Sequence, residues 1–66
     1  MVNKVRLYRI AKEMRQQDLA EAAGCSQQEI SAIEKGEIIP TVYVAFRIAR
    51  VLGRSVEELF MLEEKE

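Results

Sequence analysis

The chain has 66 residues, enough for one domain at most, and a formal net charge of −1. Its one cysteine cannot form an internal disulfide, and without histidine the common zinc sites and Ser-His-Asp or Cys-His catalysis are excluded. No apolar run approaches the roughly 18 residues of a membrane span, so we expect no membrane segment. We expect a cytoplasmic protein, as a lone cysteine fits a reducing compartment. From the excluded residue types we also expect that it is not an enzyme and uses no metal or cofactor.

The charges are distributed unevenly along the chain. Residues 1–15 carry five basic side chains and one acidic side chain, a local charge of +4, whereas residues 53–66 carry two basic and five acidic ones, a local charge of −3. A polyanion would be attracted to the first region and repelled by the second. The alternative interpretation is that both regions are ordinary solvated surfaces.

Apolar residues recur at spacings of three and four throughout the chain, which predicts an all-α fold of five short helices. We expect the first helix over residues 4–13, with Asn3 as its cap. The second covers residues 16–23 and stops at Gly24, because glycine adopts the positive φ of such a turn readily.

The third predicted helix begins after Ser26, which forms a capping box with Glu29, and ends at Gly36. The fourth follows Thr41 and continues to about residue 52. A second capping box over residues 55–58 opens a short fifth helix, and residues 61–66 form an acidic tail. We expect residues 1–66 to make one domain. The residues expected on the apolar side of the fourth helix are Val42, Ala45, Phe46, Ile48, Ala49 and Leu52.

The second and third predicted helices have the spacing of a helix-turn-helix over residues 16–35. Ala20 is small, as required where the third helix crosses close to the second. Gly24, four residues later, makes the turn, and Ile30 packs back between the two helices. With two capping boxes and flanking helices, this pattern predicts a compact DNA-binding domain.

The outward face of the third predicted helix carries neutral polar side chains. Gln27, Gln28 and Ser31 can both donate and accept hydrogen bonds, and a glutamine that pairs with adenine in the major groove discriminates by about 1–3 kcal/mol. Ala32 can contact a thymine methyl group. We predict that these four residues read duplex DNA rather than RNA. The alternative is that they only fill a solvated face.

Residues 5–60 resemble the Cro and phage-repressor (xenobiotic-response-element) family of five-helix regulators. The resemblance implies a lambda-repressor-like fold, with the helix-turn-helix at helices two and three, and a sequence-specific transcriptional regulator, most simply a repressor. The matching residues are Arg9, Met14, Gln16, Leu19, Ala20, Gly24, Ser26, Ile30, Ile33, Glu34, Gly36, Pro40, Ile48, Ala49, Leu52, Gly53 and Leu59.

The resemblance also implies roles for individual residues. Gln27 and Gln28 match the start of the recognition helix, where related repressors contact base edges. Arg9 and Glu34 match a partly buried salt bridge between the first and third helices. The residues that we expect to bind DNA phosphates are Arg15, Gln16, Ser26, Lys35 and Gly36.

Three features depart from the family pattern or leave alternatives open. Arg15 replaces the usual Ser or Thr, so a hydroxyl cap worth about 1 kcal/mol is lost, although the arginine can reach a phosphate. The connector over residues 37–39 is acidic where the family is often basic. We expect Ile38 and Ile39 to pack on the chain's own core, with a partner as the alternative. We expect Cys25 to pack in the turn, with a redox switch as the alternative.

One recognition helix covers only a few base pairs, so we expect a homodimer whose two helices lie about 34–36 Å apart on a palindromic site. The first choice for the dimer interface is Val56, Leu59, Phe60 and Leu62, although part of this set must complete the core. The second choice is Leu7 with Ile10.

An antitoxin or another protein-interaction module with the same fold is the alternative function, and residues 61–66 would then bind the partner.

Overall fold

The computed structural model describes residues 2–60, so the acidic tail and Leu62 lie outside the described residues. Within them the chain forms five helices and no strand, which confirms the predicted all-α fold. The helices are α1 (Val5–Ala11), α2 (Gln16–Ala23), α3 (Gln27–Glu34), α4 (Val42–Leu52) and α5 (Val56–Phe60).

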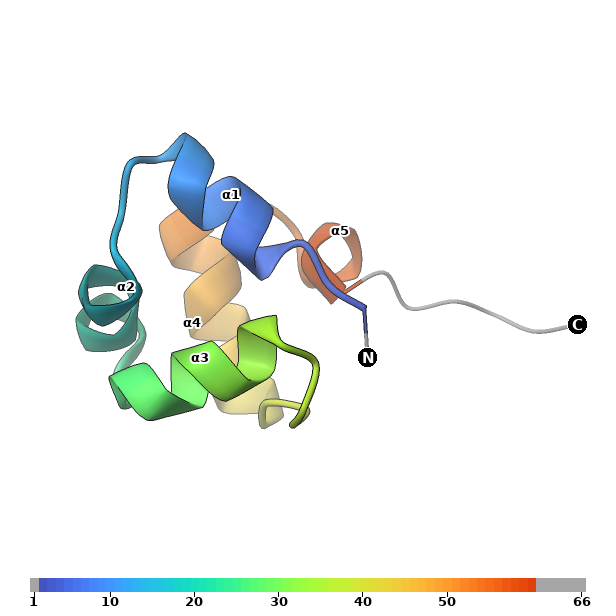
Figure 1. The fold of residues 1–66 in the computed structure, drawn as a ribbon. Coiled ribbons are helices and arrows are strands. Elements are labelled where there is room, and N and C mark those ends of the chain that lie inside the picture. Colours follow the sequence, from blue (N-terminus) through green and yellow to red (C-terminus); the bar gives the residue numbers. More distant parts are fainter. Residues whose placement is uncertain (1, 61–66) are drawn as a thin grey trace, which may run out of the picture.

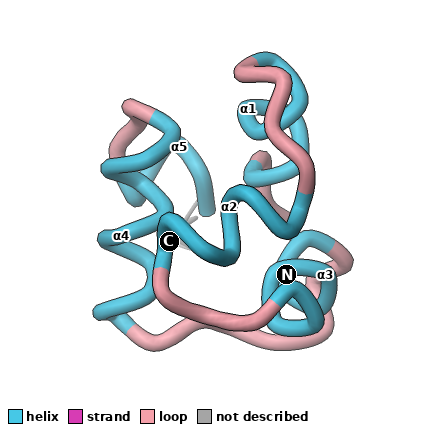
Figure 2. The backbone as a smooth tube through the Cα atoms, turned by 90° about the vertical axis from the view of Figure 1, so that its left-hand side faces the viewer, coloured by secondary structure: helices cyan, strands magenta, loops and turns pink. Residues whose placement is uncertain are grey.

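The five helices surround one small core. Helix α4 packs against α1, α2 and α5, while α3 packs against α2 and α1 (Figure 1). Seen from the side, α2 lies between α4 and α3 (Figure 2). Every helix contributes apolar side chains to the interior. The buried apolar residues are Val5, Leu19, Ala20, Ala23, Ile30, Ile33, Ala45, Ile48, Ala49, Leu52, Leu59 and Phe60.

Both predicted capping boxes are present. The Ser26 hydroxyl accepts a hydrogen bond from the Glu29 amide at 3.0 Å, and the Glu29 carboxylate accepts one from the Ser26 amide at 3.3 Å. Ser55 and Glu58 make the same two bonds, at 3.1 and 2.9 Å. Each box satisfies amides that the first turn of a helix leaves without a partner, so the starts of α3 and α5 are set locally.

Helix α1 is shorter than the predicted 4–13 because the chain turns sharply after Ala11. Glu13 has a φ of 59°, in the left-handed region, which ends the helix without a glycine. The residue directly before α1 is Lys4 rather than the predicted cap, Asn3. Asn3 still contacts the start of the helix: its side-chain carbonyl accepts from the Val5 amide at 3.1 Å, and its side-chain NH₂ donates to the backbone carbonyl of Ile33 at 2.7 Å. The backbone amide of Lys4 donates to the backbone carbonyl of Leu59 at 2.6 Å.

Candidate nucleic-acid interface

The turn between α2 and α3 has the geometry that the sequence predicted. Gly24 has a φ of +75°, and the Cys25 amide donates to the Ala20 carbonyl at 3.0 Å. Ala20 is 2% exposed and Ile30 is fully buried, so a small side chain and a large one meet where the two helices cross. Cys25 packs against the core, and burial raises the pKa of its thiol.

The predicted base-reading residues lie on the surface of α3 to different degrees. Gln27 and Gln28, in its first turn, are exposed, whereas Ser31 and Ala32 are half-buried. This arrangement follows from Ile30 and Ile33, which are fully buried and hold the opposite side of the helix against the core. The first turn of α3 is therefore the part most accessible to a ligand.

An ion pair joins α1 to the end of α3. The Arg9 guanidinium binds both carboxylate oxygens of Glu34, with Nε–Oε2 at 2.6 Å and Nη2–Oε1 at 3.2 Å. Its third nitrogen donates to the carbonyl of Met14 at 2.7 Å. The two charged side chains are only 10% and 3% exposed, and such a pair is costly to break because it leaves a buried charge without a partner.

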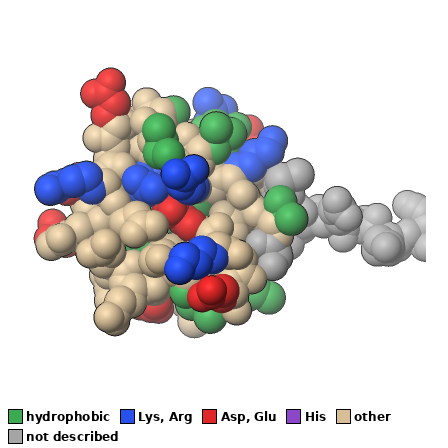
Figure 3. Space-filling model, in the orientation of Figure 1, with side chains coloured by type: hydrophobic (Ala, Val, Ile, Leu, Met, Phe, Trp, Pro, Cys, Tyr) green, Lys and Arg blue, Asp and Glu red, His purple; other side chains and the backbone are tan. Residues whose placement is uncertain are grey.

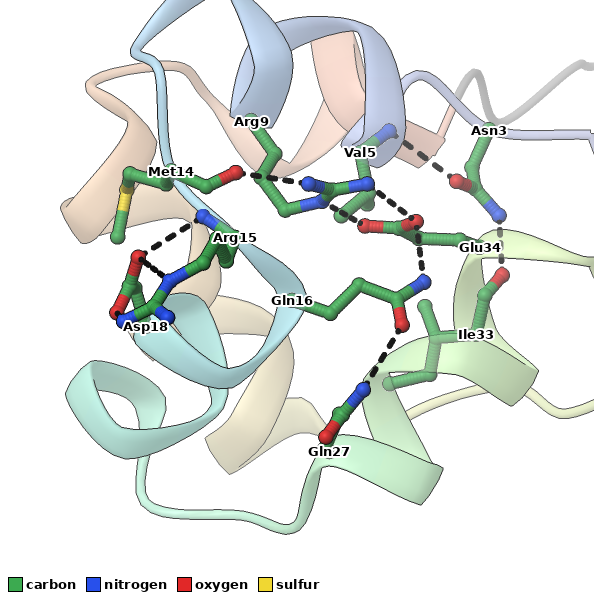
Figure 4. A network of polar contacts seen from close by, with 10 residues as sticks. All are labelled: Asn3, Val5, Arg9, Met14, Arg15, Gln16, Asp18, Gln27, Ile33 and Glu34. Atoms are coloured by element: carbon green, nitrogen blue, oxygen red, sulfur yellow. Dashed lines mark hydrogen bonds and ion pairs between the residues drawn. The ribbon is translucent and has the colours of Figure 1, made fainter.

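Two glutamines extend this ion pair to the start of α3 (Figure 4). The side-chain NH₂ of Gln16, at the start of α2, donates to Glu34 Oε1 at 3.1 Å. Gln27 in turn donates to the side-chain carbonyl of Gln16 at 3.4 Å. The result is one chain of polar contacts from Arg9 to Gln27, across three helices. Sequence periodicity contains no signal for the contact between the two glutamines.

The comparisons with known proteins agree with this geometry. The HTH_3 helix-turn-helix family model matches residues 5–59. The chain belongs to this family. A relative from Methanocaldococcus jannaschii is 42% identical over 66 residues, all of both chains, and one from Bacillus subtilis is 35% identical over 65 residues, 98% of both chains. A third, from Methanothermobacter thermautotrophicus, is 43% identical over 61 residues, 91% of this chain and 88% of the relative.

These relatives are all named as HTH-type transcriptional regulators. The family is thus one of DNA-binding regulators of transcription. The resemblance to Cro-like and repressor-like regulators is confirmed at the level of the family.

The residues predicted to bind phosphates lie at the start of α2 and at the two ends of α3. They differ in which of their hydrogen-bonding groups are already used by other residues. Lys35 is exposed directly after α3, and Gly36 follows it with a φ of +78°. The Ser26 hydroxyl accepts the bond that caps α3, which leaves its O–H free to donate to a phosphate. The face of the molecule that carries α1 and α3 shows Lys and Arg side chains around acidic ones (Figure 3).

Arg15 is engaged by a neighbouring carboxylate. Its guanidinium pairs with Asp18 at 3.1 Å, and its amide donates to the same carboxylate at 2.9 Å. These bonds hold the pKa of Asp18 below its usual value and raise the pKa of Arg15. Asp18 thus supplies the carboxylate half of a capping box for α2. The hydroxyl half is missing because residue 15 is an arginine. For Arg15 to bind a phosphate, the phosphate must compete with Asp18.

Two predictions about apolar residues need correction. Leu59 and Phe60 are 0% and 3% exposed, so they belong to the core rather than to a dimer surface, and Val56 is partly buried against them. The opposite holds for Val42 and Phe46, expected on the apolar side of α4 but 71% and 60% exposed. It holds also for Ile38 and Ile39, expected on the core but 41% and 73% exposed. Helix α5 is short and covers only part of the wide apolar side of α4.

Two further findings concern residues 2–60. These residues contain no group of three or more His, Cys, Asp or Glu side chains placed to hold a metal ion. None of the five helices has the length and apolar character that crossing a membrane requires.

Proposed function

We propose that this member of the family is a homodimeric, sequence-specific repressor that inserts α3 into the major groove of a palindromic double-stranded DNA operator. Residues 1–66 act in this proposal as one DNA-binding domain. The observation that carries it is the state of Gln27: exposed at the start of α3, yet held from behind by Gln16.

The contact between the two glutamines leaves Gln27 the groups that base reading requires. Its side chain has two N–H donors and one carbonyl acceptor. One N–H is used on Gln16, so one donor and the carbonyl remain, and this is the pair that adenine N7 and N6 require in the major groove. A side chain that is already oriented loses less conformational entropy on binding.

Phosphate contacts would position α3 without reading sequence. We expect these contacts from two places in the chain. Arg15 and Gln16 lie at the start of α2, and Lys35 and Gly36 directly follow α3. The amides at a helix start attract anions. Because the net charge is −1 and Asp18 competes for Arg15, we expect one copy to bind weakly.

A dimer corrects this weakness, because two identical helices can enter successive major grooves about 34–36 Å apart. A dimer on its operator excludes other proteins from the same DNA, and for this reason we propose repression. We place the regulator in the cytoplasm, where the chromosomes of bacteria and archaea lie.

Selection from random DNA duplexes tests the proposal. The wild-type chain should enrich a two-fold symmetric sequence, and its affinity should fall steeply with salt concentration. Gln27→Ala should relax the preference at one base pair of each half-site, with a loss of about 1–3 kcal/mol for the preferred base, and should leave thermal stability near that of wild type.

Gln17→Ala is the matched control, because Gln17 is also an exposed glutamine but contacts only Glu21. It should leave the base preference unchanged. If no sequence is enriched, the proposal of operator reading is wrong. If Gln27→Ala weakens binding equally to all sequences, Gln27 does not read bases.

A further inference from the structure

A second surface, on the side of the molecule formed by the connector and α4, is apolar, and none of residues 2–60 covers it. Ile39, Val42 and Phe46 are 73%, 71% and 60% exposed. They border a hollow of about 340 Å³ that Ala45 and Phe60 also line. Contiguous exposed apolar surface is uncommon on soluble proteins, and where it occurs it usually marks an interaction site.

A second hollow, of about 500 Å³, adjoins the first. Phe46 and Val56 line both hollows, and the second is also lined by Ala49, Arg50 and Glu57. The exposed ring of Phe46 therefore stands between two concave areas. We call Ile39, Val42, Phe46, Val56 and the two hollows the Phe46 surface.

We infer that the Phe46 surface binds the same surface of a second copy of this chain. A two-fold contact places a patch against its own copy, so the patch must contain both a projecting group and a hollow that receives it. The Phe46 surface contains both. This inference rests on the proposed homodimer and assigns its interface to residues outside the buried core, in place of Leu59 and Phe60.

The charges around the second hollow also fit a second copy. Arg50, Arg54 and Glu57 line the same hollow and are exposed, and Arg54 already pairs with Glu58 at 3.8 Å. Because the hollow carries both signs, Arg50 of one copy can face Glu57 of the partner subunit. A surface with charges of one sign would repel its copy.

The other exposed apolar pair, Leu7 and Ile10 on α1, fits a second copy less well. These side chains are 58% and 48% exposed. Arg6 on α1 and the flanking Lys4 and Lys12 are exposed and basic, and they outnumber the one exposed acidic residue next to the helix, Glu13. Two copies joined through this face would bring like charges together. The α1 face is therefore the natural control for the Phe46 surface.

Sedimentation equilibrium of the full chain tests the inference through Phe46→Ser and the matched variant Leu7→Ser. Both positions are exposed, so both variants should keep the helical circular dichroism of wild type. Phe46→Ser should raise the dimer dissociation constant roughly thirtyfold or more, the size expected of a central aromatic contact, and Leu7→Ser should leave it unchanged. The reverse pattern, or a wild-type chain that stays monomeric at millimolar concentration, overturns the inference.

The charged pair provides a second measurement on the same protein. Arg50→Glu alone should weaken the dimer, because it places two acidic residues opposite each other. Adding Glu57→Arg should restore dimerisation, since the exchanged pair again has opposite signs. Failure of the double variant to recover overturns the pairing of Arg50 with Glu57 of the partner subunit.

DNA binding measured in parallel separates this inference from the proposed function. Phe46→Ser should bind single half-sites with the base preference of wild type and should lose the extra affinity for the two-fold site. A wild-type chain that dimerises through the Phe46 surface but enriches no DNA sequence contradicts only the proposed function. A wild-type monomer that reads one half-site contradicts only the inference made here.

Discussion

The start of α3 and the Phe46 surface are both exposed, but the chain prepares them in different ways. At the start of α3, polar contacts hold an exposed glutamine from behind, through Gln16 and Glu34 to Arg9. On the Phe46 surface, large apolar side chains extend into solvent beside hollows that they do not fill. A polar surface can thus be oriented before its ligand arrives, whereas an apolar surface gains its stability only when it is covered.

The largest expected effect is on the free energy of unfolding, and it distinguishes the buried Phe60 from the exposed Phe46. Phe60→Ala should lower the free energy of unfolding by about 3–5 kcal/mol, because it empties part of the core. A loss of that size approaches the whole stability of a domain this small. Phe46→Ala should cost less than about 1 kcal/mol in the monomer, since the ring is already mostly solvated.

Urea unfolding of both phenylalanine variants, at a concentration where wild type is monomeric, measures the difference. Equal losses would show that Phe46 contributes to the core as much as Phe60 does, and the contrast between a buried and an exposed apolar region would then fail.

The next effect concerns the polar side of the comparison. Glu34→Ala should destabilise the fold by about 3 kcal/mol, because it leaves the buried Arg9 guanidinium without its carboxylate. The control is Arg15→Ala, which breaks the exposed pair with Asp18 and should cost far less, because solvent screens that pair. Thermal unfolding followed by circular dichroism gives both values. Equal losses would mean that burial does not distinguish the two ion pairs.

The smallest effect is a dependence of stability on pH. Hydrogen bonds from Arg15 lower the pKa of Asp18, and bonds from Ser55 lower that of Glu58, below their ordinary values of 3.8 and 4.5. A lowered folded pKa contributes stability that is present above the ordinary value and is lost as the pH falls through the folded one. Glu58→Gln should therefore lower stability at neutral pH and flatten the acid limb of a stability–pH curve.

Glu57→Gln removes the same charge one residue earlier and does not affect the cap, and it is compared at a concentration where the chain is monomeric. Its acid limb should keep the slope of wild type. If the two variants give the same curve, the capping bonds of Glu58 do not account for the acid sensitivity.

The features predicted from sequence are those that neighbouring residues determine. Ser26 with Glu29 and Gly24 with its positive φ act within a few residues of the chain, so their patterns are visible in the sequence. The end of α1 was missed because Glu13, rather than a glycine, adopts the left-handed conformation. The core was misjudged at Phe46 and Leu59, because periodicity marks an apolar face but does not indicate which part of it another helix covers.

The recognition-helix residues illustrate the same limit. That Gln27 would be exposed followed from the helical positions of Ile30 and Ile33. The bond from Gln27 to Gln16 depends on how two helices cross and on which side-chain conformers meet there. A single sequence contains neither.

The contacts of Asn3 and Lys4 have a consequence for the order in which this protein folds. Asn3 bonds to Ile33 and the Lys4 amide bonds to Leu59, so the first turn of the chain is held by residues 30 and 55 positions later. Closing a loop that long costs entropy which only the completed core repays. We therefore expect the start of α1 to gain its full set of contacts only when α5 is in place, and a chain cut before Leu59 to contain all of α3 but to lack the bond that holds Lys4.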